Sequence, residues 1–186
     1  MNAEPMSPEA TLRRWHDDED AVRRRIGAPG VARRDEVAAL SGLEFFHAIF
    51  DGVVPSPPIG AATGMLPIRI EHGIAIFQGR PSRTHYNPLG TVHGGWIATM
   101  LDSCVGCAVH STLPAGRSYT TAELKVNFVR PLTDAVPLVR AEGRIIHIGR
   151  SMGTAEGRLV GHDGRLYAHA TTTCFIFETP QPKATS

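Results

Sequence analysis

A chain of 186 residues is long enough for one domain with a hydrophobic core, and one domain plus an extension is its natural interpretation. Hydrophobic residues make up 42% of the chain and charged residues 20%, and the formal net charge is +1. This balance excludes a fibrous or intrinsically disordered chain, and it gives no reason to expect a nucleic-acid or membrane partner.

The N-terminus has neither a basic start nor an apolar run, and no segment approaches the ~20 consecutive apolar residues that span a bilayer. Three cysteines, an odd number, suit free thiols in a reducing compartment. We therefore expect a cytoplasmic protein.

The first 40 residues predict a charged helical extension. From residue 8 to about residue 34 charged side chains dominate and apolar positions are sparse, with an interruption at Gly27–Gly30. Basic and acidic residues are mixed along this stretch, which favours a solvated helix face over a nucleic-acid-binding arm.

The main domain is expected over residues 41–180, followed by a disordered tail at 181–186. Ser41 and Glu44 have the spacing of a capping box, and the apolar residues that follow predict a short amphipathic helix ending at Asp51. The proline-rich segment 54–60 then predicts an extended connector.

Beyond residue 64 the hydrophobic period becomes that of strands. Residues 65–71 and 74–80 predict a hairpin, and residues 94–111 predict a long apolar helix. Four strand-like segments follow with short links, which indicate antiparallel neighbours. The sequence therefore predicts an α+β fold in which one antiparallel sheet curls around one central helix.

The first of these four segments alternates along residues 120–128. Ala122, Leu124, Val126 and Phe128 are expected on a buried face, because they alternate with polar residues that would face water.

Asp102 is the only formally charged residue between Gly94 and Val109, within a helix that is apolar nearly all round. An aspartate is rarely buried unless it is paired, because its ionised form loses hydration. Two interpretations remain: a hydrogen-bonded core aspartate, or a catalytic or ligand-binding group at the edge of a cleft.

The helix start is a candidate oxyanion site. His93, Gly94 and Gly95 lie where the first backbone N–H groups have no partner within the helix, and glycine allows close approach of a ligand. Gly94 and Asp102 are, however, ~12–13 Å apart along the helix axis, so they cannot serve one site within one chain. Two antiparallel helices across a two-fold axis would bring them together, so the protein must be at least a homodimer if both groups are catalytic.

Residues 85–132 closely resemble the hotdog-fold acyl-CoA thioesterases, in the branch that includes the phenylacetate-degradation thioesterase. The resemblance extends over roughly residues 60–178. The matching residues are Asn87, the His93-Gly94-Gly95 triplet, Asp102, the Leu113-Pro114-x-Gly116 loop, Thr121, Leu124, Phe128 and Arg130-Pro131.

The resemblance implies hydrolysis of an acyl-CoA thioester. It assigns polarisation of the carbonyl to the Gly94 amide, and the role of general base or nucleophile to Asp102 of the partner subunit. Asn87 and His93 would hold the carbonyl-binding loop, and Thr121 matches a hydroxyl that orients water in some relatives. A second such hydroxyl, one helical turn after the acid in some relatives, is replaced here by Gly106.

The resemblance also indicates substrate-binding positions. Arg130 and Arg150 lie at strand ends where relatives bind the CoA phosphates, although a solvated arginine remains the alternative for each. Gly95 and Trp96 would contact the substrate at the helix start, with a plain core role as the alternative for Trp96.

No metal or cofactor is expected. Cys104, Cys107 and His110 would fan across ~120° of a helix rather than converge on one ion.

Pairing of dimers into a homotetramer is expected. Two other functions remain open: a hotdog enoyl-CoA hydratase or dehydratase, and a non-catalytic acyl-CoA-binding or sensor protein.

Overall fold

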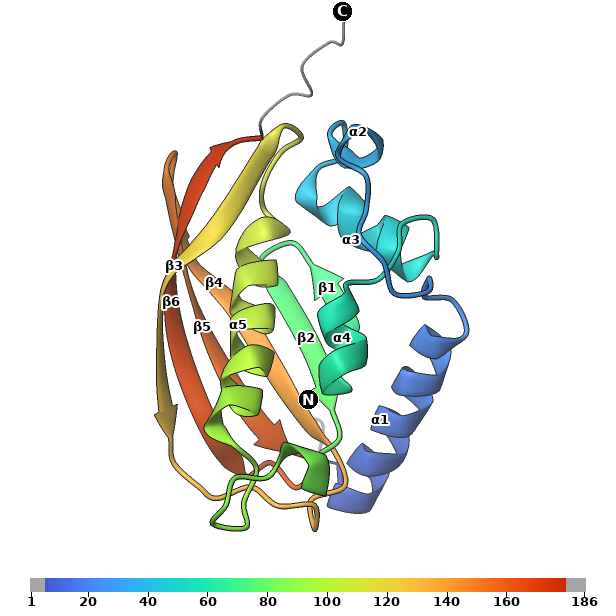
Figure 1. Cartoon of the computed structure of the whole chain (residues 1–186), viewed down its shortest axis with the longest axis vertical. Coiled ribbons are helices and arrows are strands. Elements are labelled where there is room, and N and C mark those ends of the chain that lie inside the picture. Colours follow the sequence, from blue (N-terminus) through green and yellow to red (C-terminus); the bar gives the residue numbers. More distant parts are fainter. Residues whose placement is uncertain (1–5, 180–186) are drawn as a thin grey trace, which may run out of the picture.

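The computed structural model describes residues 6–179, apart from the side chain of Arg34. Six antiparallel strands form one sheet that curls around the long helix α5 (Gly94–His110) (Figure 1). The strands are β1 (Leu66–Glu71), β2 (Ile74–Gly79), β3 (Arg117–Phe128), β4 (Val139–Ile148), β5 (Met152–Gly161) and β6 (Leu166–Glu178). The expected α+β fold is confirmed, and the tail at 181–186 lies outside the described residues.

Helix α5 is the centre of the core. Met100, Leu101, Cys104 and Val105 are fully buried against the concave face of the sheet. A Cβ atom at Gly143 of β4 would collide with the carbonyl oxygen of Cys104, so glycine lets the strand lie directly against the helix. In the described part of the chain, no helix is long and apolar enough to cross a membrane.

The strand order is β1-β2-β4-β5-β6-β3, so β3 pairs with β6 and not with β4. The expectation that short links join neighbouring strands is therefore wrong for the link between β3 and β4. Residues 129–138 can reach ~33 Å when extended, which is more than three inter-strand spacings of ~4.8 Å. This link crosses the end of the sheet instead of making a hairpin.

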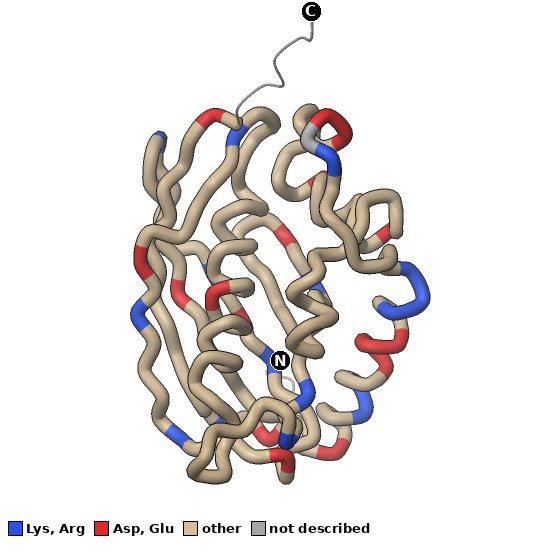
Figure 2. Tube along the Cα trace, viewed as in Figure 1, with Lys and Arg blue, Asp and Glu red and all other residues tan. Residues whose placement is uncertain are grey.

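Four helices precede the sheet: α1 (Pro8–Arg23), α2 (Arg34–Val37), α3 (Gly42–Phe50) and α4 (Pro58–Thr63). The charged helix, which was expected to continue to about residue 34, ends at Arg23. A one-turn 3-10 helix, η1 (Arg83–His85), follows β2. The capping box of Ser41 and Glu44 is present at the start of α3. Acidic and basic segments gather along α1, whereas α5 is mostly free of both (Figure 2).

The expected extended connector at 54–60 is wrong in its second half, because α4 begins at Pro58. A proline is tolerated at the first position of a helix, since its φ is already suitable and the missing N–H has no intrahelical acceptor there. Gly64 ends this helix in the left-handed region, with φ of 70°.

The N-terminal helices cover one edge of the sheet and leave the other bare. α1 and α3 pack against the edge strand β1. The twelve-residue strand β3 forms the other edge, and no strand among the described residues pairs with its outer side. An uncovered edge of this length offers backbone donors and acceptors to another strand.

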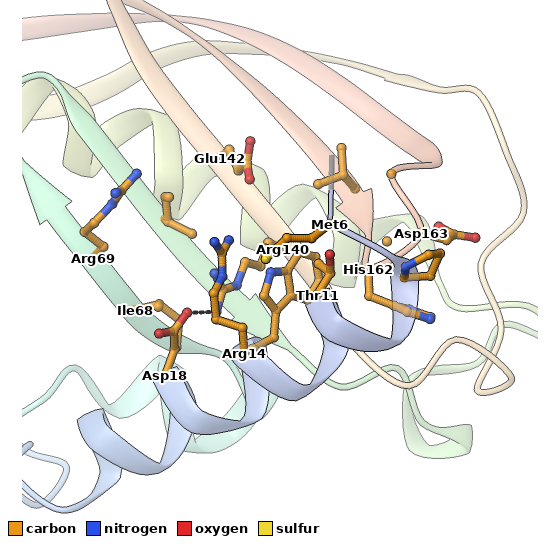
Figure 3. A pocket seen from close by; sticks show the side chains of 16 residues that line it. Met6, Thr11, Arg14, Asp18, Ile68, Arg69, Arg140, Glu142, His162 and Asp163 are labelled. Carbon is orange, nitrogen blue, oxygen red and sulfur yellow. Dashed lines mark hydrogen bonds and ion pairs between the residues drawn. The ribbon is translucent and has the colours of Figure 1, made fainter. Parts of the chain in front are cut away.

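Arg140 fastens α1 to the outer face of the sheet (Figure 3). Its Nη2 donates to Oδ2 of Asp18 at 2.7 Å, its Nε donates to Oε1 of Gln78 at 2.9 Å, and its guanidinium lies 4.6 Å from the centre of the Trp15 ring. Gln78 in turn donates to the Trp15 carbonyl oxygen and to Glu19. Because Arg140 and Gln78 are buried, each depends on these partners.

We expect Arg140→Met to lower the free energy of unfolding by about 2–3 kcal/mol, because it leaves the buried amide oxygen of Gln78 without a donor. The control Arg144→Met changes an exposed arginine of the same strand, and its effect is expected to stay within about 0.5 kcal/mol. Urea unfolding followed by circular dichroism measures both. Equal losses in the two variants would contradict the role given to this network.

Candidate active site

Asp102 and Thr121 lie together in the structure. Asp102 is partly buried on α5, and the hydroxyl of Thr121 on β3 donates to its Oδ1 at 3.0 Å. A β-bulge at Ala122 brings the two side chains into this position, since the register of β3 on β6 shifts between Thr121 and Glu123. The extra residue places Thr121 on the inner face together with Leu124.

This bulge overturns part of the expected alternation of β3. Ala122 is exposed rather than buried, and Phe128, at the end of the strand, is 54% exposed. Leu124 and Val126 are partly buried on the inner face, as expected. A one-residue bulge does not change the hydrophobic pattern of the sequence, so the pattern could not reveal it.

An apolar cavity of about 460 Å³ opens beside Asp102. Among the described residues, the charged residues that line it are Asp102 and Arg23. Burial, together with the negative charge of Asp102, raises the pKa of the Cys107 thiol to about 12, and burial raises that of the Tyr119 phenol well above its usual value. Both groups are therefore neutral near pH 7, and Asp102 is the only acidic residue among the described residues of the wall.

Gly106 lies one turn after Asp102, and Tyr119 occupies the space beside it. A Cβ atom at Gly106 would lie 2.7 Å from the Tyr119 hydroxyl oxygen. The phenol of Tyr119 therefore fills the volume that a side chain at position 106 would need.

The start of α5 lies beside a second, smaller cavity of about 370 Å³. Gly94, Asn87 and Arg130 are among its lining residues, together with Phe128 at the end of β3. Among the described residues the Gly94 amide has no hydrogen-bond acceptor. It is a free N–H donor at the positive end of the helix dipole.

Asn87 and His93 hold the loop that precedes this amide. The Asn87 side-chain oxygen accepts from the Leu89 and Thr91 amides at 2.9 and 3.3 Å, and its Nδ2 donates to Oγ1 of Thr91. His93 Nδ1 accepts from the Gly95 amide at 2.8 Å and so caps the helix. Both side chains therefore bond to the backbone around the start of α5.

Three residues that were expected to bind substrate, Trp96, Arg130 and Arg150, line neither the Asp102 cavity together nor one common site. Trp96 is buried, stacks on His85, and donates from its indole to the Thr63 carbonyl oxygen at 2.8 Å, so it contacts neither cavity. Arg130 and Arg150 are both exposed.

The two arginines lie at opposite ends of β6. The Arg130 amide donates to the carbonyl oxygen of Tyr167, whereas Ser151, next to Arg150, accepts from the amide of Ile176. Nine residues of strand separate these contacts, which is ~30 Å. One chain therefore does not bring Arg130 and Arg150 to one ligand.

The fold and sequence both match one family. Residues 89–168 match the thioesterase superfamily. A solved structure of a predicted thioesterase related to phenylacetic acid degradation, from Ralstonia eutropha, is 30% identical with a TM-score of 0.65, covering 70% of this chain and 98% of that one. The chain belongs to the thioesterase superfamily. The expected hotdog fold and the likeness to phenylacetate-degradation proteins are thereby confirmed.

Two archaeal proteins are also similar to this chain. A predicted esterase of Saccharolobus solfataricus is 28% identical over 112 residues, which are 60% of this chain and 78% of that protein. A predicted esterase of Halobacterium salinarum is 35% identical over 69 residues, which are 36% of this chain and 44% of that protein. The match therefore spans less than half the length of the second relative.

In this thioesterase-superfamily chain the expected site residues form two separate groups. Asp102 lines the cavity of about 460 Å³ and contacts Thr121, whereas Asn87, Gly94 and Arg130 line the cavity of about 370 Å³. Gly94 and Asp102 are on one continuous helix, so they stay ~12 Å apart along its axis. In the part of the chain that the structure describes, no three His, Cys, Asp or Glu side chains converge as metal ligands.

His110, the last residue of α5, is packed among the rings of Phe45, Phe46 and Tyr119. Burial lowers its pKa from 6.5 to about 4, because the apolar surroundings disfavour the charged imidazolium. The folded protein therefore holds this imidazole neutral at a pH where the unfolded chain protonates it.

The unfolded chain binds the extra proton below pH 6.5, so we expect the free energy of unfolding to fall as pH drops from about 6.5 to about 4, by up to ~3 kcal/mol. His110→Phe should remove this part of the pH dependence, and His47→Gln, at an exposed position on α3, should retain it. Urea unfolding at several pH values measures the slopes. Identical slopes for wild type and His110→Phe would refute the assignment.

Proposed function

We propose that this protein hydrolyses acyl-CoA thioesters to a free acid and CoA, with Asp102 and the Gly94 amide as the groups that act on the thioester. The observation that carries the proposal is the position of Asp102, the one acidic residue among the described residues that line an apolar cavity, which accepts a hydrogen bond from the Thr121 hydroxyl at 3.0 Å. A carboxylate at the edge of an apolar cavity has the placement of a general base or a nucleophile.

The chemistry can follow two routes. In the first, Asp102 takes a proton from water while the water oxygen bonds to the thioester carbonyl carbon. In the second, the carboxylate oxygen itself bonds to that carbon, and water later hydrolyses the resulting anhydride. In both routes the C–S bond breaks, and the sulfur leaves as the CoA thiolate and takes up a proton.

The Gly94 amide would stabilise the negative charge that develops on the carbonyl oxygen. It is a backbone donor fixed at a helix start, and it needs no rearrangement when the charge forms. The raised pKa of Cys107 argues against a cysteine nucleophile, because the neutral thiol is unreactive.

A homodimer would complete the site, with Gly94 from one subunit and Asp102 from the other. The uncovered edge strand β3 supports this proposal, since a second copy can continue the sheet there. The less buried stripe of α5 carries Gly95, Ala98, Thr99 and Asp102, and its small side chains allow a second helix to approach closely.

Pairing of two dimers has separate support on the outer face of the sheet. Four large apolar side chains on three neighbouring strands, β4, β5 and β6, are exposed there, and a second dimer would cover them. These side chains are Ile146, Met152, Phe175 and Phe177.

We expect Asp102→Asn to lower the turnover of the best acyl-CoA substrate by at least ~10²-fold, because the amide cannot act as a base or nucleophile. The amide is isosteric and can still accept the Thr121 hydrogen bond. Release of free thiol from aromatic and from short, medium and long aliphatic acyl-CoAs measures turnover, and Asp17→Asn on the exposed face of α1 is the control. Retained activity in Asp102→Asn would refute the assignment.

Two other outcomes would replace the proposal. Tight acyl-CoA binding with no turnover across the whole panel would indicate a sensor. Hydration of an enoyl-CoA, with saturated acyl-CoAs left intact, would indicate a hydratase.

Mixed dimers test the shared site. Gly94→Pro removes the amide donor, and the helix should tolerate it because the position is the first of α5 and His93 already has an extended backbone, with φ of −62° and ψ of 135°. Asp102→Asn and Gly94→Pro homodimers should both be inactive. Random mixing of the two subunits should restore about a quarter of wild-type activity, because half of the dimers then contain one intact site.

Gly94→Ala is the matched control, since it adds the same Cβ atom near the Phe128 ring and keeps the N–H. It should retain far more activity than Gly94→Pro. Absence of any recovery in mixed dimers, with mixing verified by mass spectrometry, would show that the site lies within one subunit.

A further inference from the structure

The N-terminal extension reaches the cavity beside Asp102. Arg23, Ile26, Gly27 and Pro29 all line it, although they lie more than 70 residues before Asp102 in the sequence. None of them falls within residues 89–168, the region that matches the thioesterase superfamily. One wall of the cavity is therefore built by a segment that the family match does not cover.

Hydrogen bonds fix this segment in place. The Ile26 amide donates to the Val22 carbonyl oxygen at 2.9 Å and so continues the last turn of α1. The Gly30 amide donates to the carbonyl oxygen of Ser56, and the Ser56 hydroxyl donates to the carbonyl oxygen of Gly27, both at 2.9 Å. The segment is thus a defined wall and not a loose end.

Helix α4 and Met65 close another side of the cavity. The Trp96 indole donates to the Thr63 carbonyl oxygen, which ties the end of α4 to α5. Ile59 of α4 lines the cavity, and the hydroxyl of Ser103, the residue after Asp102, lies 3.6 Å from the Met65 sulfur. The cavity therefore extends from the catalytic carboxylate to both the extension and α4.

The cavity has the size and chemistry of a pocket for an aliphatic chain. Its wall is mainly apolar, formed by Ile, Leu, Met, Phe, Pro and Ala residues, and its volume of about 460 Å³ lies within the usual range for ligand pockets. A cavity of about 150 Å³ holds one benzene ring, so a phenylacetyl group would fill only part of this one. Unfilled apolar volume forfeits contacts and gives weak binding.

We propose that this cavity binds the acyl group of the substrate as a medium-length, straight aliphatic chain of about 8–12 carbons, and that the extension sets the limit on its length. The inference rests on the proposed hydrolysis of acyl-CoA and names the substrate class of the same site. The thioester would lie at Asp102, and the end of the chain would contact Ile26.

The test compares wild type with Ile26→Trp and Ile59→Trp, each of which adds a large ring to the cavity from a different segment. Val31→Trp is the matched control, because Val31 is 84% exposed in the same extension and does not line the cavity. The first measurement is kcat/KM for butyryl-, octanoyl-, dodecanoyl- and phenylacetyl-CoA. The second is the affinity for dodecanoyl-CoA, measured by calorimetry on Asp102→Asn alone and on Asp102→Asn combined with each Trp substitution.

Wild type should prefer octanoyl- or dodecanoyl-CoA over butyryl- and phenylacetyl-CoA by about tenfold or more. Either cavity-filling variant should lower kcat/KM for dodecanoyl-CoA by about tenfold and leave that for butyryl-CoA nearly unchanged. Preference for phenylacetyl-CoA, or an unchanged chain-length profile in both variants with native circular dichroism spectra, would overturn the inference.

The two proposals fail in different ways. Hydrolysis that depends on Asp102 but not on the cavity variants refutes only the chain-length inference. If no acyl-CoA is hydrolysed, calorimetry still decides: weaker dodecanoyl-CoA binding on filling the cavity supports the acyl pocket, and unchanged binding refutes it.

Discussion

A straight helix keeps residues eight positions apart at a fixed separation, and this constraint governs the candidate site. Gly94 supplies a free backbone donor and Asp102 supplies a carboxylate, but α5 holds them ~12 Å apart and at two different cavities. The strands pack against one side of α5, which is a continuous helix from Gly94 to His110 and keeps the two groups apart. Under the proposed function each chain would supply two half-sites, and a second copy would join them.

The two edge strands of the sheet differ in whether other elements cover them. At β1, helices from the N-terminal region cover the edge, and the Arg140 network holds α1 on the outer face nearby. At β3 the edge is bare, and β3 also carries Thr121, which contacts Asp102. The edge left open is thus the one next to the Asp102 carboxylate, where a second subunit would approach in the proposed dimer.

The sequence alone predicted the sheet, the central helix and the capping box of α3, because these depend on local periodicity and spacing. It missed α4, since two consecutive prolines concealed a helix start, and it missed the bulge at Ala122, since one extra residue leaves the hydrophobic pattern intact. The pairing of β3 with β6 depends on contacts between distant segments, which periodicity does not encode. The position of Tyr119 over Gly106 has the same origin.

The extension shows how a segment outside the family match can act at the site. Arg140 holds α1 on the outer face of the sheet. The contacts that offset the conformational entropy lost when the extension becomes ordered therefore lie away from the cavity. Ile26, Gly27 and Pro29 then pass the β1 edge and line the cavity. Because α1 is already fixed, these residues lose little further conformational entropy. Under the proposed acyl-CoA hydrolysis, such a wall would change the acyl group accepted without altering Asp102, Thr121 or Gly94.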